Sequence, residues 1–174
     1  MRRVPSQRTF RPGYARYAHV GASQGSRTSF VGRLSPDPDA YDLTFRSSRF
    51  RGEGDVEATM RAIRYMMHAL VGMNVDYLLA HPETPTVYAS GVRYKPEEAD
   101  EELWADIPAV LRQGVADCED LAAWRIADLI VREGVMAKPH VSVGYLPDGR
   151  PLYHVRVEHP DGRIEDPSVA LGMR

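Results

Sequence analysis

Residues 114–124 read GVADCEDLAAW, and this stretch holds Cys118, the only cysteine of the 174-residue chain. A glycine-containing loop runs here into a strong helical pattern, which places Cys118 at the predicted start of a helix. The first backbone N–H groups of a helix have no partner within it, and the helix dipole is positive at that end. Both effects favour a thiolate, so we expect a lowered pKa for the Cys118 thiol.

Two interpretations of Cys118 compete at this point. Free cysteines are among the most buried residue types and often pack as small hydrophobic side chains. Here, however, the neighbours are the acids Asp117, Glu119 and Asp120 rather than apolar residues. The local sequence leaves the structural and the nucleophilic role equally open, and the choice depends on residues further downstream.

Length and composition indicate a globular domain with an appendage, because 174 residues are enough to bury a core. No apolar run approaches the roughly 18 residues that a membrane span needs. No apolar segment follows Arg2 and Arg3, as a secretory signal would require. We therefore expect no membrane contact and a cytoplasmic location. One cysteine excludes an internal disulfide framework and a cysteine-rich zinc site.

The formal charge of −2 hides an asymmetry between two parts of the chain. Residues 1–36 contain seven arginines and no acid, whereas residues 37–174 hold 15 basic and all 24 acidic residues. The first part is therefore near +7 and the second near −9. Residues 1–54 lack a sustained helical or strand period and are rich in Arg, Ser, Gly and Pro, which predicts an extended arm ahead of a domain over residues 55–174.

The arm carries aromatic residues between its arginines: Tyr14, Tyr17, Phe30, Tyr41, Phe45 and Phe50. Exposed ion pairs contribute only about 0–1 kcal/mol each, whereas ordering the backbone costs about 1–2 kcal/mol per residue. Surface charge alone therefore cannot order the arm, and burial of its aromatic side chains in a partner is required. We expect residues 1–54 to lie on a protein partner or neighbouring subunit, with nucleic acid as the second choice.

Hydrophobic periodicity predicts helices over residues 55–80, over residues 107–113 and from Cys118 to Gly134. Residues 86–94 suggest a small hairpin around a Ser-Gly pair. After residue 138 the period changes to 2, which is typical of strands. The expected fold class is α+β, with helices packed on a C-terminal antiparallel β-sheet.

Two copies of one turn sequence fix the register of that sheet. Residues 147–149 and 160–162 both read Pro-Asp-Gly, a pattern typical of a three-residue hairpin loop in which the glycine adopts the left-handed conformation. The first turn pairs Ser142 with His154. The second turn then places His154 and Asp166 on the same face of adjacent strands, as diagonal neighbours about 7 Å apart.

These residues are the parts of a thiol triad. Cys118 is the expected nucleophile, His154 the base that takes the thiol proton and later protonates the leaving group, and Asp166 the acid that orients the imidazole. A single strand histidine is usually structural, but the order Cys, His, Asp together with this turn geometry favours the catalytic interpretation. Gln113 could add an amide donor for the oxyanion, although its position slightly favours an ordinary helix-end role.

The segments DCEDLA (117–122) and YHVRVEHPDGRIEDPS (153–168) resemble the transglutaminase-like cysteine protease superfamily, which has a papain-like fold. The resemblance covers about residues 103–170 and implies the same triad of Cys118, His154 and Asp166. It also implies amide or peptide hydrolysis, or acyl transfer. The family often has glycine where this chain has Ala116. No stretch resembles a calcium-binding loop, so we expect no metal and no cofactor.

YASGVRY (88–94), DCEDLAAWR (117–125) and EDPSVALGM (165–173) together resemble small uncharacterised proteins of tailed bacteriophages. This second resemblance implies a virion-associated location as the alternative to the cytoplasm. It also implies another class of function, a non-enzymatic structural or assembly protein that retains the transglutaminase-like fold and docks through its N-terminal arm. Whether the triad is active stays open at this point.

Deletion of residues 1–50 tests the arm. If the arm docks on a partner, the truncated protein loses its association with that partner while its melting temperature is unchanged, as size-exclusion chromatography and thermal unfolding would show. A large drop in melting temperature with association intact would contradict this role. Binding that instead weakens steeply with salt would identify nucleic acid as the partner.

Overall fold

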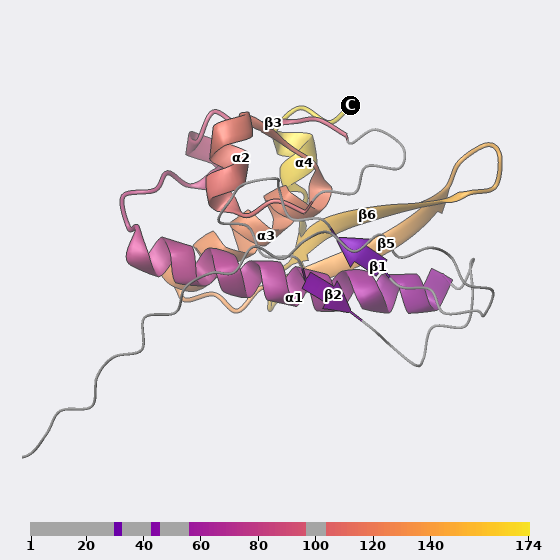
Figure 1. Cartoon of the computed structure of the whole chain (residues 1–174), viewed down its shortest axis with the longest axis horizontal. Coiled ribbons are helices and arrows are strands. Elements are labelled where there is room, and N and C mark those ends of the chain that lie inside the picture. The colour runs from indigo at the N-terminus through magenta and orange to yellow at the C-terminus, as the bar shows by residue number, and fades with distance from the viewer. Residues whose placement is uncertain (1–29, 33–42, 46–55, 97–103) are drawn as a thin grey trace, which may run out of the picture.

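The computed structural model describes residues 30–32, 43–45, 56–96 and 104–174 (Figure 1). These residues form a mixed helical and sheet architecture whose C-terminal sheet is antiparallel, as the sequence predicted. In chain order the elements are β1 (Phe30–Gly32), β2 (Leu43–Phe45), α1 (Val56–Ala80), the 3-10 helix η1 (Val87–Ala89), β3 (Arg93–Tyr94), α2 (Ile107–Gln113), β4 (Val115–Ala116), α3 (Cys118–Asp128), the π-helix η2 (Leu129–Glu133), β5 (Lys138–Tyr145), β6 (Pro151–Glu158), β7 (Ile164–Glu165) and α4 (Pro167–Ala170).

Helix α1 covers the sheet, as its apolar face predicted. It extends across most of the folded body in Figure 1 and contacts both α3 and β5. Its buried residues recur at helical spacing: Ala58, Ala62, Ile63, Met66, Met67, Leu70, Val71, Asn74 and Leu78. Within the described chain no helix has the length and apolarity of a membrane span, the 25 residues of α1 included.

Helix α3 is the central helix, and nine of its 11 residues are buried. Ala122, Ala123 and Ala127 are fully buried, and side chains this small let neighbouring elements approach closely. One side of α3 joins the core formed with α1 and the sheet, and the other joins the core formed with α2 and η1. Because a helix buried all round has little freedom to move, the position of its first residue, Cys118, is well defined.

The C-terminal sheet has the predicted register. β6 lies between β5 and β7, and Ser142 is paired with His154. Gly149 and Gly162 close the two turns with φ of 85° and 84°, a conformation that glycine adopts without the clash of a side chain. His154 therefore lies on the face opposite to the buried valines of β6.

Those valines attach the sheet to the helices. Val141, Val155 and Val157 lie in the core with α1 and α3. Burying one aliphatic side chain of this size contributes about 1.5–3 kcal/mol. A shift of the β6 register by one residue would turn Val155 and Val157 to the other face. The same packing that holds the sheet therefore also fixes the direction of His154.

The predicted hairpin over residues 86–94 is wrong. The Ser90 hydroxyl donates to the Val87 carbonyl at 2.7 Å and accepts from the Val92 N–H at 3.1 Å, which closes a local turn at the end of η1. The following residues of β3 pair instead with β4, in parallel. A long-range pairing therefore replaces the local one.

Most of the arm lies outside the described residues, so its predicted docking on a partner stays a prediction. Within residues 1–54 the structure describes only β1 and β2, which pair with each other in antiparallel fashion. The sequence did not predict this pair, because strands of three residues are too short to show a period of 2.

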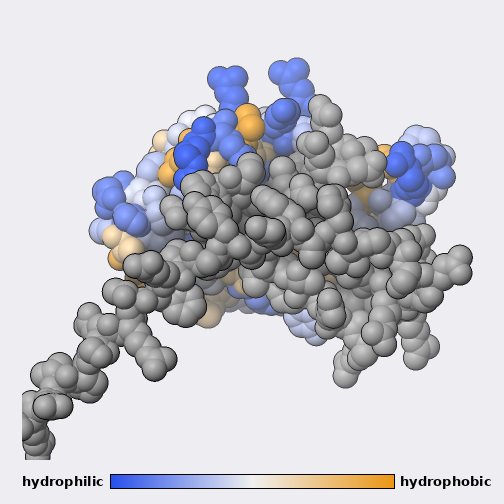
Figure 2. Space-filling model, viewed as in Figure 1, coloured by the Kyte–Doolittle hydropathy of each residue, from blue (hydrophilic) through white to orange (hydrophobic). Residues whose placement is uncertain are grey.

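Exposed hydrophobic side chains on the described surface are scattered: Tyr65, Leu79, Tyr88, Met136, Tyr145, Leu152, Ile164 and Val169. On the face shown in Figure 2, hydrophilic side chains dominate the described surface and hydrophobic ones form small, separate patches. The tip of the β5–β6 hairpin projects beyond the helices in Figure 1.

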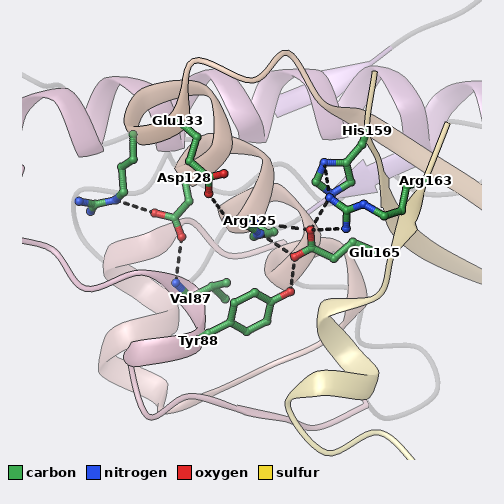
Figure 3. Close-up of polar contacts among 9 residues, drawn as sticks. Val87, Tyr88, Arg125, Asp128, Glu133, His159, Arg163 and Glu165 are labelled. Carbon is green, nitrogen blue, oxygen red and sulfur yellow. Dashed lines mark hydrogen bonds and ion pairs between the residues drawn. The ribbon is translucent and has the colours of Figure 1, made fainter. Parts of the chain in front are cut away.

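A polar cluster attaches β7 to the helical part of the molecule (Figure 3). Its centre is Glu165, which accepts hydrogen bonds from Arg125 Nε at 2.6 Å and from the Tyr88 hydroxyl at 2.5 Å. Arg163 donates to His159 Nδ1, so His159 carries its proton on Nε2 and donates it to Glu165 at 2.6 Å. One carboxylate thereby joins β7 to α3 and to η1.

The charge of Glu165 is stabilised in this cluster. Burial alone would raise the pKa of its carboxyl, but the hydrogen bonds from Arg125, Tyr88 and His159 outweigh burial and lower the pKa from 4.5 to about 2. An acid with a lowered pKa in the folded state stabilises the fold above its ordinary pKa. That contribution is lost as pH falls from about 4.5 toward about 2, where the folded state finally takes up the proton.

We expect Glu165→Gln to remove this acid-dependent step. Hydrogen bonds to a charged group contribute roughly 1.5–3 kcal/mol, so loss of the charge opposite Arg125 is expected to lower the free energy of unfolding by about that much at pH 7. Glu133→Gln is the matched control, because Glu133 binds the same arginine but is half exposed, and we expect it to cost at most about 1 kcal/mol. Urea unfolding across the acid range measures both, and equal losses in the two variants would contradict a structural role for Glu165.

Candidate thiol site

His154 and Asp166 form the contact that the sequence predicted. His154 Nε2 lies 2.8 Å from Asp166 Oδ2, and both side chains are about a quarter exposed or less. The other carboxylate oxygen, Oδ1, accepts from the backbone N–H groups of Ser168 and Val169 and so caps α4. One oxygen of Asp166 is therefore fixed by a helix start, and the other orients the imidazole.

This contact determines which ring nitrogen of His154 is available. A carboxylate accepts hydrogen bonds, so Nε2 carries the ring proton and Nδ1 of the neutral ring keeps its lone pair. In the described part of the chain, Nδ1 has no hydrogen-bond partner. The Ser142 hydroxyl donates to the backbone carbonyl of His154 at 3.3 Å and holds the strand at this point. His154 is thus oriented to accept a proton at Nδ1.

Cys118 lies beside the strand that carries His154. It is the first residue of α3 and is partly buried against the core. It packs on the cluster that contains Val155, the residue after His154, and the backbone N–H of Val155 acts to lower the pKa of the thiol. The thiol donates to Glu119 Oε2 at 3.1 Å. Among the described side chains there is no hydrogen bond between Cys118 and His154, so their direct contact stays a prediction.

The expected low pKa of Cys118 is wrong for this conformation. Burial raises the pKa of the thiol, and the carboxylates of Glu119 and Asp117 raise it further, while only the Val155 N–H acts in the opposite direction. A helix dipole contributes about 0.3–1 kcal/mol. A charge about 4 Å away contributes about 4 kcal/mol at an effective dielectric constant near 20. The acids therefore outweigh the dipole, and the thiol is neutral at rest.

The acids around Cys118 also have a structural role that the sequence did not reveal. Asp117, Glu119 and Asp120 are all buried. Asp120 accepts a hydrogen bond from the backbone N–H of Ala105 at 2.7 Å, which holds the segment before α2 against α3. Acidic neighbours in the sequence favour a nucleophilic role for Cys118, but in the structure they are part of the packed interior.

Tyr94 is a site residue that sequence reasoning missed. Burial raises the pKa of its phenol, and so do the charges of Cys118, Asp117, Glu119 and Asp166. The backbone of Tyr94 lies between the segments that carry both residues, because it pairs with Ala116 and its N–H donates to the Leu171 carbonyl. The sequence placed Tyr94 in a hairpin, and only the parallel pairing of β3 with β4 moves it to this site.

Gln113, which the sequence offered as an oxyanion donor, is the exposed last residue of α2. No hydrogen bond of its side chain occurs in the described ranges. This position suits the ordinary helix-end role. Trp104 and Trp124 are both buried and belong to the two core clusters. Within the described residues, no group of three or more His, Cys, Asp and Glu side chains is arranged to hold a metal ion.

Glu119 controls the thiol in this geometry, and Glu119→Gln tests it. Removing the negative charge beside the sulfur lowers the thiol pKa, so alkylation of Cys118 by iodoacetamide at pH 7 is expected to become faster, by roughly tenfold for each pKa unit. The single cysteine lets mass spectrometry follow one site. Glu57→Gln, at an exposed site on α1, is the control and leaves the rate unchanged. Slower alkylation of Glu119→Gln would show instead that Glu119 is the base.

Comparison of the chain with protein-family models, with curated proteins and with solved structures gave no match. The transglutaminase-like resemblance therefore stays an expectation drawn from the motifs around Cys118 and His154. Function has to be argued from the geometry of this site.

Proposed function

We propose that Cys118, His154 and Asp166 carry out thiol-dependent acyl chemistry on an amide or ester carbonyl, within a transglutaminase-like, papain-like domain. The observation that supports this best is the oriented His154–Asp166 pair, whose Nδ1 has no partner among the described residues, on the strand against which Cys118 packs. A structural histidine needs neither a free ring nitrogen nor a cysteine beside its strand.

The reaction would follow the usual order for a thiol nucleophile. His154 Nδ1 takes the thiol proton, the sulfur forms a bond to the carbonyl carbon, and the C=O π pair moves to the oxygen. Collapse of the tetrahedral intermediate expels the leaving group, which receives the proton from the imidazolium. Water or an amine then attacks the thioester and releases the acid or a new amide, with Cys118 again a thiol.

At rest the thiol proton is directed to Glu119 rather than to His154. The proposed reaction therefore begins with a change of hydrogen-bond partner at Cys118. Asp166 supports that change, because a carboxylate on Nε2 stabilises the imidazolium that forms. The resting state is accordingly a low-reactivity form of the site.

The neutral, partly buried thiol favours a second candidate, a non-enzymatic structural or assembly protein that retains the fold. In that case Cys118 and its acids are packing elements of α3. The N-terminal arm then provides binding to a protein partner such as a neighbouring subunit of a virion. This candidate predicts no acylation of Cys118.

Acylation by p-nitrophenyl acetate separates the two candidates. The enzyme proposal expects a burst of p-nitrophenol and a mass increase of one acetyl group on Cys118. His154→Ala is expected to slow acylation by roughly 10²–10⁴-fold, the usual contribution of a general base. His140→Ala, on the neighbouring strand, is the matched control and leaves the rate unchanged. No acylation of the unmodified protein, or equal rates with and without His154, would favour the structural candidate.

A further inference from the structure

Tyr94 is joined by its backbone to both segments that carry the site. It pairs with Ala116, two residues before Cys118. Its N–H donates to the Leu171 carbonyl at 3.0 Å, in the segment that follows Asp166. The next N–H, of Lys95, donates to the Ala116 carbonyl at 2.9 Å. The position of Tyr94 is thus fixed relative to the nucleophile and relative to the orienting acid.

The side chain of Tyr94 is a donor without an acceptor. The ring is partly buried and packs on the core cluster that contains Ala116, while its hydroxyl reaches solvent and has no hydrogen-bond partner among the described residues. Tyrosine hydroxyls usually find a partner when they are buried. Tyr88 shows the ordinary case in this chain, because its hydroxyl binds Glu165. An unused O–H group beside a nucleophile is available for a bound substrate.

The charge around Cys118 makes such a donor necessary. Attack on a carbonyl places a negative charge on the carbonyl oxygen beside Cys118, where the carboxylates of Glu119 and Asp117 already act on the sulfur. Unscreened carboxylates would raise the energy of that oxyanion. Hydrogen-bond donors directed at the oxygen are the usual means of stabilising it. The backbone N–H of Cys118 at the start of α3 is one donor, and a second is needed from another element.

We propose that the Tyr94 hydroxyl donates a hydrogen bond to the carbonyl oxygen of the acyl group as Cys118 attacks it. This inference rests on the proposed acyl chemistry and assigns the oxyanion role, predicted for Gln113, to a residue on β3. Tyr94 keeps its proton throughout. The electron pair that moves to the oxygen returns when the leaving group departs. The same charges that raise the phenol pKa keep Tyr94 in the protonated, donating form.

Tyr94→Phe tests the role with two reactions of the same sulfur. Acylation by p-nitrophenyl acetate passes through an oxyanion, whereas alkylation by iodoacetamide is a displacement at a saturated carbon and forms none. We expect Tyr94→Phe to slow acylation by roughly 10²–10³-fold, as for loss of one oxyanion donor, and to leave alkylation unchanged. Tyr65→Phe, at an exposed site on α1, is the matched control and leaves both rates unchanged.

Three other outcomes would contradict the proposed role of Tyr94, and each can be told from the others. Equal losses in both reactions would show that Tyr94 only holds β3 and the thiol in place. Unchanged acylation in Tyr94→Phe, with His154→Ala inactive, would remove Tyr94 from the mechanism while the triad stands. No acylation of the unmodified protein would refute the proposed function and this inference together. His154→Ala, which removes the base, is expected to slow acylation and alkylation alike, and this sets it apart from Tyr94→Phe.

Discussion

The carboxylate of Glu165 is the group on which the position of the site depends. A largely shielded carboxylate is stable as an anion when donors surround it, and here they come from α3, from η1 and from the turn before β7. Asp166 is the next residue, so the cluster that satisfies Glu165 also determines where Asp166 meets His154. Stability and the candidate chemistry are therefore coupled at two adjacent residues, with Arg125 of the central helix as the link.

Much of the fold could be predicted because local chemistry determines it. The Pro-Asp-Gly turns fix the register of β5, β6 and β7 through the conformation of Gly149 and Gly162. Helix α2 has the predicted bounds because Asp106 caps its first turn and Gly114 ends it in the left-handed conformation. The same local rules were sufficient to bring His154 and Asp166 together, since both residues lie within a few positions of a turn.

The rest of the site depends on contacts between residues distant in sequence. The raised pKa of Cys118 follows first from burial of the thiol and then from the charges of Glu119 and Asp117, and burial is a property of the whole core. Tyr94 reaches the site only through a parallel pairing of β3 with β4, which no local pattern indicates. A helix-start cysteine is thus recognisable from sequence, but its protonation state is not.

The turns that align the site also contain a sequence that is prone to isoaspartate formation. Each contains an Asp-Gly pair, at residues 148–149 and 161–162. Because glycine has no side chain, its own backbone nitrogen can attack the side-chain carboxyl carbon of the preceding aspartate. Loss of water gives a succinimide, and its hydrolysis gives an isoaspartyl link with one extra backbone carbon. In the second turn that carbon would lengthen the path between His154 and Asp166. Slow ageing of the purified protein would therefore separate the imidazole from its acid before the helical core is affected.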